Sequence, residues 1–103
     1  MSKPLISIIV RTKNENYWIG KCLHAINNQN YKNIEIILVD NSSKDNTVQI
    51  VKRNFPKVKI INYKDKKFFP GKAINLGVKK SKGKFIAIIS GHCIPKNNFW
   101  ISN

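Results

Sequence analysis

The chain has 103 residues, of which 42% are hydrophobic, which suits one small globular domain and not a disordered chain. A net charge of +14 favours phosphate-bearing ligands, an anionic membrane surface or nucleic acid as partners. No apolar run reaches the roughly 20 residues of a membrane span, no secretion signal opens the chain, and two cysteines are too few for a disulfide framework, so we expect a cytoplasmic location.

The basic residues are almost all lysines, with Arg11 and Arg53 as the two exceptions. Arginine is the side chain best suited to forked contacts with guanine and phosphate. An abundance of Lys, Asn and Ile also matches an AT-rich genome, which would raise the charge without any partner. Nucleic acid is therefore disfavoured as a partner.

The first half of the chain alternates between strand and helix patterns. Residues 5–10 form a nearly continuous apolar run, which predicts a strand buried on both faces. From Trp18 to Ile26 the apolar residues recur at helical spacing, and Cys22 lies on that apolar face. Residues 34–39 are dense in β-branched side chains and predict a second strand that ends at Asp40.

The second half continues the alternation. Ser42 and Asp45 match a helix-capping signal, and a helical pattern follows over residues 48–55. Residues 58–61 predict a third strand, residues 73–78 a helix, and residues 85–89 a fourth strand. The order β-α-β-α-β-α-β predicts one α/β domain over residues 1–103, a Rossmann-like open parallel sheet with right-handed crossover helices.

Ligands of such sheets bind beyond the carboxyl ends of the strands. The segments expected at that edge are residues 12–16, 40–43, 69–72 and 90–93. Glu15 and Asp40, with Thr12 and Asn14 beside them, offer acceptors for a ribose hydroxyl or a base N–H. A turn role suits Asp40 equally well.

Two further features of this edge have more than one interpretation. Pro70 and Gly71 lead into a helix start where Lys72 would favour an anion, although a plain loop with a solvated lysine is common. His92 and Cys93 make an incomplete metal site, and adjacent residues rarely form a nucleophile pair. His92 is therefore a residue at the edge of the site, and Cys93 a packing residue.

Four segments carry a resemblance that covers residues 5–100: "SIIVRTKNE", "NIEIILVDNSSKDNT", "PGKAINLGVKKSKGKFIAIIS", and "IP" followed by "FW". The chain resembles the N-terminal half of family 2 glycosyltransferases of the GT-A fold. The resemblance implies transfer of a sugar, with inversion, from a nucleotide diphosphate sugar to a hydroxyl of a glycan or lipid-linked glycan. It also implies Mg or Mn as cofactor, and a role in cell-surface polysaccharide or glycolipid synthesis.

The same resemblance assigns roles to individual residues. Thr12 and Glu15, with Asn14 between them, match positions that line the nucleoside pocket, and Asp40 matches the aspartate that recognises the base. Lys72 and Asn75 match the helix start near the donor.

The fourth strand departs from the family pattern. Ser90, Gly91 and His92 stand where the family has an acidic D-x-D signature that holds the ribose and the metal. Ser90 is then a candidate ribose contact, and His92 either contacts the diphosphate directly or serves as a single metal ligand. A neutral imidazole adds no negative charge to hold Mg or Mn, so the resemblance gives weaker support for a metal here than elsewhere in the family.

The resemblance places the catalytic base in a later segment, beyond residue 103. We therefore expect a donor-binding part of an incomplete GT-A domain, without independent turnover, in the cytoplasm or at the inner face of the cell membrane. The alternative that stays open is a non-catalytic basic module that docks on an anionic membrane or on nucleic acid.

Overall fold

The computed structural model describes residues 3–64 and 70–92, and of residues 70–73 the backbone alone. The elements in chain order are β1 (Ile6–Thr12), α1 (Ile19–Asn27), β2 (Ile34–Asn41), α2 (Thr47–Asn54), β3 (Lys59–Tyr63), α3 (Pro70–Lys80) and β4 (Phe85–Ser90). The predicted alternation of strands and crossover helices is confirmed.

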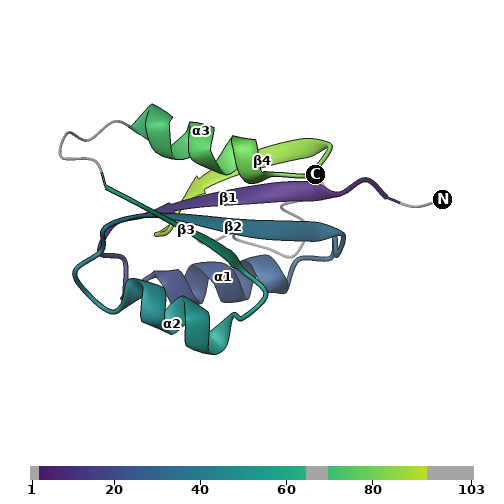
Figure 1. Ribbon diagram of the computed structural model, residues 1–103. Helices are drawn as coiled ribbons and strands as arrows, with labels where there is room; N and C mark the ends of the chain where they lie inside the picture. Colours follow the sequence, from purple (N-terminus) through teal and green to yellow (C-terminus); the bar gives the residue numbers. More distant parts are fainter. Residues whose placement is uncertain (1–2, 65–69, 93–103) are drawn as a thin grey trace.

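The strands form one parallel sheet in the order β3-β2-β1-β4. The chain adds β2 and β3 on one side of β1, and α3 then carries it back across the sheet to β4 on the other side. Figure 1 shows α1 and α2 covering one face of the sheet and α3 the other. Strand order thus reverses between β1 and β4, and ligands of open α/β sheets bind beyond the strand ends at such a point.

The central strand β1 contributes to two apolar layers because successive side chains point to opposite faces. Ile8 and Val10 belong to the larger core cluster, which they share with α1 and α2. Ile9 belongs to a smaller cluster with Ile37 and Val39 on the other face. The predicted burial of this strand on both faces is confirmed.

Helix α3 lies close to β1 at Gly77. A Cβ atom at that position would lie 2.6 Å from Cγ2 of Ile9, closer than real side chains approach. Glycine therefore lets α3 pack directly on the central strand, above the smaller apolar cluster.

Helix α1 buries its apolar stripe, including the predicted Cys22, while His24 is exposed and its Nε2 lies 3.0 Å from Nδ2 of Asn28. Across the described residues, 3–64 and 70–92, the helices are all too short or too polar to span a bilayer.

The helical pattern predicted from residue 48 is confirmed, but the capping role predicted for Ser42 is wrong. Ser42 does not cap the helix, which begins at Thr47. The carboxylate of Asp45 accepts a hydrogen bond from the backbone N–H of Thr47 at 2.9 Å, and Ser42 instead adopts φ 48° and donates to the carbonyl oxygen of Tyr63 at 3.1 Å. The loop after β2 is thereby longer than the capping pattern indicates.

Strands β1 and β2 each run two residues beyond their apolar runs. Backbone pairing continues to Thr12 opposite Asp40, and Asn41 pairs with Tyr63 of β3. Thr12, Asp40 and Asn41 at the expected binding edge therefore stand on ordered strands, which fixes their positions. Asn14 and Glu15 lie in the loop after β1.

Candidate functional site

Asn14 joins the loops that follow β1 and β2. Its φ of 54° lies in the left-handed region, which asparagine tolerates better than most residues. Its N–H donates to Oγ of Ser43 at 2.9 Å, and its side-chain oxygen accepts from the N–H of Lys44 at 2.7 Å. The two loops are held together by these bonds.

Asp40 also links β1 to the loop that follows β2. The side chain is 1% exposed. Its carboxylate accepts from the hydroxyl of Thr12 at 2.6 Å, from the N–H of Ser43 at 2.9 Å and from the hydroxyl of Ser43 at 2.5 Å. These donors explain how a carboxylate can be buried, because each one replaces a bond to water.

Asp45 holds the start of α2 against the loop after β1. Its carboxylate accepts from the hydroxyl and N–H of Thr47 and from the N–H of Asn16, while the Thr47 hydroxyl accepts from the N–H of Glu15 at 2.9 Å. Burial alone would raise the pKa of Asp45, but the donors from Thr47 and Asn16 outweigh it and lower that pKa. This acid is thus kept ionised and turned inward.

His92 lies beside the loop after β1, just past the end of β4. Its Nδ1 is 2.9 Å from Oγ of Ser90 and 3.2 Å from a carboxylate oxygen of Glu15. Both contacts involve Nδ1, so this arrangement cannot relay a proton from Ser90 through the ring to Glu15 as a hydrolase triad would. It leaves Nε2 as the ring nitrogen that can face a ligand.

Gly91 allows His92 to reach that position. Its N–H donates to the carbonyl oxygen of Arg11 at 2.8 Å. A Cβ at residue 91 would lie 2.7 Å from Cγ2 of Thr12 and 3.3 Å from the Arg11 carbonyl oxygen. A side chain at this position would push the turn away from β1, so Gly91 supports the site without offering a functional group.

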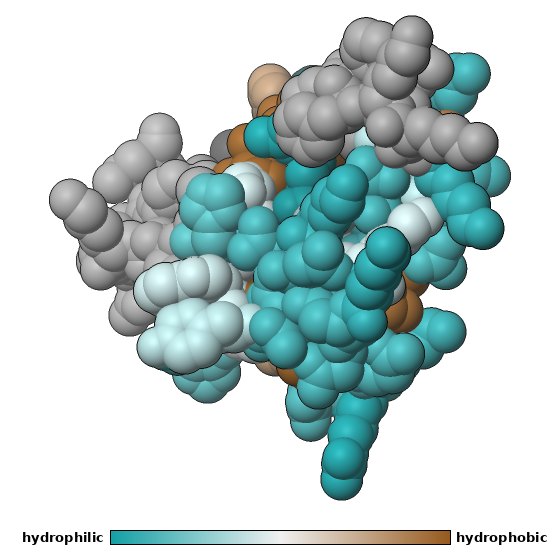
Figure 2. Space-filling view, turned by 90° about the vertical axis from the view of Figure 1, so that its left-hand side faces the viewer, coloured by the Kyte–Doolittle hydropathy of each residue, from teal (hydrophilic) through white to brown (hydrophobic). Residues whose placement is uncertain are grey.

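A cavity of about 520 Å³ opens at the carboxyl ends of the strands, large enough for a drug-sized or nucleotide-sized ligand. Its described lining is Arg11, Thr12, Lys13, Asn14, Glu15, Val39, Asn41, Tyr63, Ser90 and His92. Figure 2 looks onto this end of the molecule, where most of the described surface is hydrophilic.

Five of the predicted residues meet at this cavity: Thr12, Asn14, Glu15, Ser90 and His92. Asp40 lies behind the lining, and Asn75 is exposed on α3 and is not part of it. Lys72 belongs to α3, but its side chain lies outside the described residues, as does Cys93.

Sequence analysis missed Arg11, Val39 and Tyr63 in the lining, whereas Lys13 and Asn41 lie in segments that it expected at this edge. The Nε of Arg11 is buried and has no hydrogen-bond partner among the described residues. Alternation along β1 could have indicated Arg11, because it shares a face with Ile9 and is the last residue of that face before the strand ends.

A metal centre has little support from the described side chains. Within residues 3–64 and 70–92, no group of three or more His, Cys, Asp or Glu side chains gathers where it could hold an ion. Glu15 and His92 are the two such residues in the described lining, and they contact each other. These two residues do not by themselves form a preassembled site for Mg, which takes six ligands in octahedral geometry and draws several of them from water and substrate phosphates.

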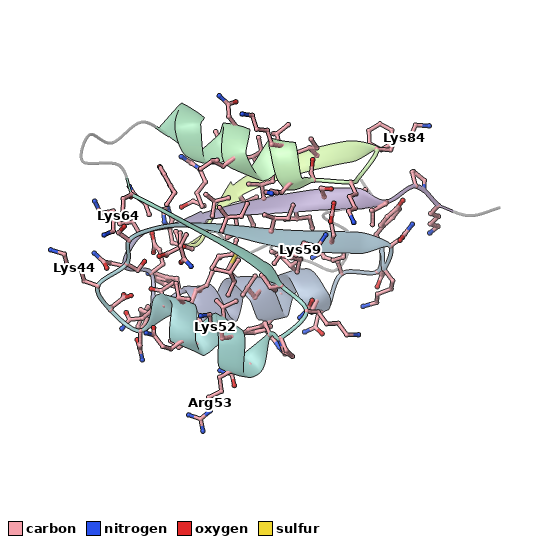
Figure 3. The ribbon with its side chains drawn as sticks, viewed as in Figure 1. Lys44, Lys52, Arg53, Lys59, Lys64 and Lys84 are labelled. Carbon is pink, nitrogen blue, oxygen red and sulfur yellow. The ribbon has the colours of Figure 1, made fainter. Side chains whose placement is uncertain are left out.

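The charges at this end of the sheet are arranged unequally. Asp40 and Asp45 are engaged within the loops, whereas Lys44 and Lys64 project from the same end into solvent (Figure 3). The described lysines at this end are therefore open to solvent, whereas its described aspartates are engaged.

The profile of the family described as "Glycosyl transferase family 2" matches residues 7–103. A Methanococcus voltae protein is 38% identical over 95% of this chain and 32% of its own length; it is named dolichyl N-acetyl-alpha-D-glucosaminyl phosphate 3-beta-D-2,3-diacetamido-2,3-dideoxy-beta-D-glucuronosyltransferase. A Campylobacter jejuni protein, GalNAc(5)-diNAcBac-PP-undecaprenol beta-1,3-glucosyltransferase, is 30% identical over 84% of this chain and 29% of its own length.

A solved structure shows the same fold. The S. aureus protein TarS 1-349, in complex with UDP-GlcNAc, superposes with a TM-score of 0.84 and 28% identity over 94% of this chain and 29% of its own. The 103 residues thus span about a third of the length of these relatives. Because the family profile covers nearly all of the chain, this protein belongs to glycosyl transferase family 2.

Proposed function

We propose that the cavity at the carboxyl ends of the strands binds a nucleotide diphosphate sugar, as the donor-binding part of a glycosyltransferase. The observation that carries the proposal is the convergence of β1, β2, β3 and β4 on one cavity of about 520 Å³ at the reversal of strand order. A nucleotide-sugar complex of the similar TarS structure supports the ligand class.

The lining suits a polar, doubly anionic ligand. Tyr63 and Val39 offer an apolar wall at the β2 and β3 side, where a base could lie flat. Arg11 and Lys13 bring positive charge to the lining, and the buried Nε of Arg11 is a donor that a phosphate oxygen would satisfy. We therefore place the base toward β3 and the diphosphate between β1 and β4.

His92 takes the position that acids hold in the family, and we propose that it contacts the diphosphate. Glu15 and Ser90 hold the ring through Nδ1, and in its imidazolium form His92 can donate through Nε2 to a phosphate oxygen. Fixed donors aimed at the diphosphate would stabilise the charge that develops on the departing nucleotide. Within the described lining, Arg11, Lys13 and His92 are the groups available for this.

The remaining parts of the proposal concern the acceptor, the base and the location. Two relatives are named for dolichyl phosphate or undecaprenyl diphosphate substrates, which supports a lipid-linked glycan as acceptor and a place at the inner face of the cell membrane. Glu15 is the one carboxylate in the described lining, and it is paired with His92. We expect the 103-residue chain to bind donor without transferring sugar, with the base supplied from outside it.

Thermal stability of the chain with UDP, GDP and dTDP sugars, each with and without Mn, tests this proposal, because a ligand that binds the folded state raises Tm. We expect one nucleotide class to raise Tm without Mn. His92→Ala should weaken that ligand about tenfold or more, as loss of a bond to a charged group does, and His92→Asp should bind only with Mn.

His24→Ala is the matched control, since it removes an exposed histidine of α1 whose contact is Asn28 and not the cavity. It should leave the affinity unchanged. Absence of a shift with every nucleotide would overturn the proposed function. Equal affinity of wild type and His92→Ala would remove His92 from the site, and a strict Mn requirement in wild type that His92→Ala abolishes would make it a metal ligand.

A further inference from the structure

Tyr17 and Trp18, the aromatic pair, form an exposed group between β1 and α1. Their exposed fractions are 66% and 40%, and the rings meet edge to face with centroids 4.7 Å apart. Nζ of Lys21 lies over both rings, 4.4 Å from the centroid of Tyr17 and 5.2 Å from that of Trp18. Large aromatic side chains are mostly buried in folded proteins, so two exposed rings that share one lysine are unusual.

Among the described residues, the aromatic pair has no internal role. Trp18 precedes the first residue of α1, but its side chain makes no capping hydrogen bond. Neither ring lines the cavity or belongs to a core cluster. Burial of the helix start is supplied by Ile19, the next residue, which is 0% exposed.

The aromatic pair lies at the same end of the molecule as the cavity. The backbone carbonyl of Glu15, a lining residue, accepts from the N–H of Trp18 at 3.0 Å and from that of Ile19 at 2.9 Å. A surface that seats the aromatic pair would therefore also face the mouth of the cavity.

The charges around the aromatic pair favour an anionic surface. Lys13, Lys21, Lys44 and Lys64 are all exposed in the segments at this end of the sheet. The acids of the same segments are turned inward: Asp40 and Asp45 into the loop bonds and Glu15 onto His92. Among the described residues, an approaching anion thus meets lysines, while the carboxylates of these segments are engaged in other contacts.

We propose that the aromatic pair and Lys21 dock this end of the protein on an anionic lipid bilayer, so that the cavity opens toward the membrane surface. The inference rests on the proposed function in one respect, which is that a lipid-linked acceptor would be met there. Tyr and Trp favour the boundary between water and hydrocarbon, and lysine stems lie along apolar surface with the charge at the headgroups.

The geometry disfavours the other occupants. A sugar ring stacks on an open aromatic face, but Lys21 covers one face of each ring, and the two ring planes stand at 83°. Nucleic acid would be expected to use arginines, but Arg11 faces the cavity and Arg53 projects from α2 away from the sheet (Figure 3).

Co-sedimentation of the full chain with vesicles tests the inference. With phosphatidylcholine vesicles that contain about 30% phosphatidylglycerol, we expect binding that weakens at high salt and is absent from pure phosphatidylcholine. Tyr17→Gln/Trp18→Gln should lower the partition coefficient about tenfold, and Lys21→Gln about fivefold.

Phe85→Gln is the matched control. Phe85 is 55% exposed and has Lys84 5.9 Å from its ring centroid, but it begins β4 at the opposite end of the sheet. Its loss should change partition by less than about twofold. In a Trp100→Phe background, Trp18 is the one tryptophan left, and its emission should shift to the blue with anionic vesicles and not with neutral ones.

Circular dichroism first confirms that each variant is folded, and nucleotide affinity is measured on the same samples. Equal partition of the wild type and the aromatic double variant, or an unshifted Trp18 emission, would overturn the docking surface even if nucleotide binds. Stronger binding to a DNA duplex than to vesicles, lost in the double variant, would also overturn it. Vesicle binding with the expected pattern but without nucleotide binding would sustain the surface and reject the donor site.

Discussion

The two ends of the sheet both depend on a carboxylate that receives several hydrogen bonds, but the two networks serve different purposes. At the amino ends of the strands, Glu35 of β2 accepts from the Ser7 hydroxyl and the N–H of Lys82, and forms an ion pair with Lys59 at 3.0 Å. At the carboxyl ends, Asp40 and Asp45 hold loops around an open cavity.

The two networks differ in which side chains they leave available to bind a ligand. Ser7 both donates to Glu35 and accepts from the N–H of Gly83, so the turn before β4 is tied to β1 and β2. Burial disfavours the charge of Glu35, but the donors from Ser7 and Lys82 and the ion pair with Lys59 outweigh it and lower its pKa to about 2. This network closes the fold, whereas the acids at the other end leave Arg11, Lys13 and His92 facing the cavity.

The largest expected effect comes from Glu35→Gln. The pKa of Glu35 falls from 4.5 to about 2 on folding, which corresponds to about 3 kcal/mol of stability at neutral pH. Urea unfolding at pH 7 should show a loss of this order, because the amide cannot accept all of the donors and loses the ion pair. Nucleotide affinity of the folded protein should not change, since Glu35 lies at the opposite end of the sheet.

The pH dependence checks the same prediction. The unfolded carboxylate binds protons near pH 4.5 and the folded one near pH 2, so the stabilisation is complete above pH 4.5 and is lost as the pH falls through that range. Asp45, whose pKa is also lowered, contributes in the same direction. Glu35→Gln should flatten the acid limb of the stability curve; an unchanged limb would show that Glu35 does not tie the amino ends together.

A smaller loss of stability is expected from Asp40→Asn. This variant tests whether the network at the carboxyl ends also stabilises the fold. The side-chain amide would place an N–H group against the hydroxyl of Thr12 or the N–H of Ser43, both of which donate to Asp40. One buried group would then lack an acceptor, at a cost of about 2 kcal/mol. If Asp40 acts through position alone, nucleotide affinity should fall only as far as the loops move, and Thr12→Val should show a milder form of both effects.

If Asp40 recognises the base, as the resemblance implies, a different result is expected. Affinity should then fall more for the nucleotide base that pairs with a carboxylate than for others, while Thr12→Val leaves base preference intact. Isothermal titration with UDP, GDP and dTDP separates these outcomes. Equal stability of Asp40→Asn and wild type would contradict the buried network itself.

The sequence predicted the fold better than the site, and the reason is physical. Apolar runs at periods of two and 3.6 specify strands and helices, so the alternation and the burial of β1 were recoverable from residues 5–89. The role of Ser42 was not, because Ser42 and Asp45 fit a local capping pattern, whereas Ser42 donates to the carbonyl oxygen of Tyr63 on β3.

Site residues divided in the same way. Thr12, Asn14, Glu15, Ser90 and His92 lie at or just after strand ends, and topology alone was enough to expect them at the edge where the cavity opens. Tyr63 lies at the end of β3 and Arg11 within β1, where a side chain's direction depends on strand register and not on composition. The contact of His92 with Glu15, 77 residues apart in the chain, depends on β4 lying next to β1.

The smallest expected effect is that of Ser90→Ala, and it distinguishes a residue that contacts the ligand from one that positions His92. Ser90 Oγ lies 2.9 Å from Nδ1 of His92, and Glu15 holds the same atom at 3.2 Å. Loss of the Ser90 contact should weaken binding of a nucleotide diphosphate sugar about threefold, because the ring keeps the carboxylate of Glu15 as a partner. The unphosphorylated nucleoside should then bind as to wild type, since His92 faces the diphosphate in the proposed arrangement. An equal loss for nucleoside and sugar nucleotide in NMR titrations would instead assign Ser90 to the ribose. In that case both Ser90 and His92 would contact the ligand at the end of β4, where the family pattern has its acidic D-x-D signature.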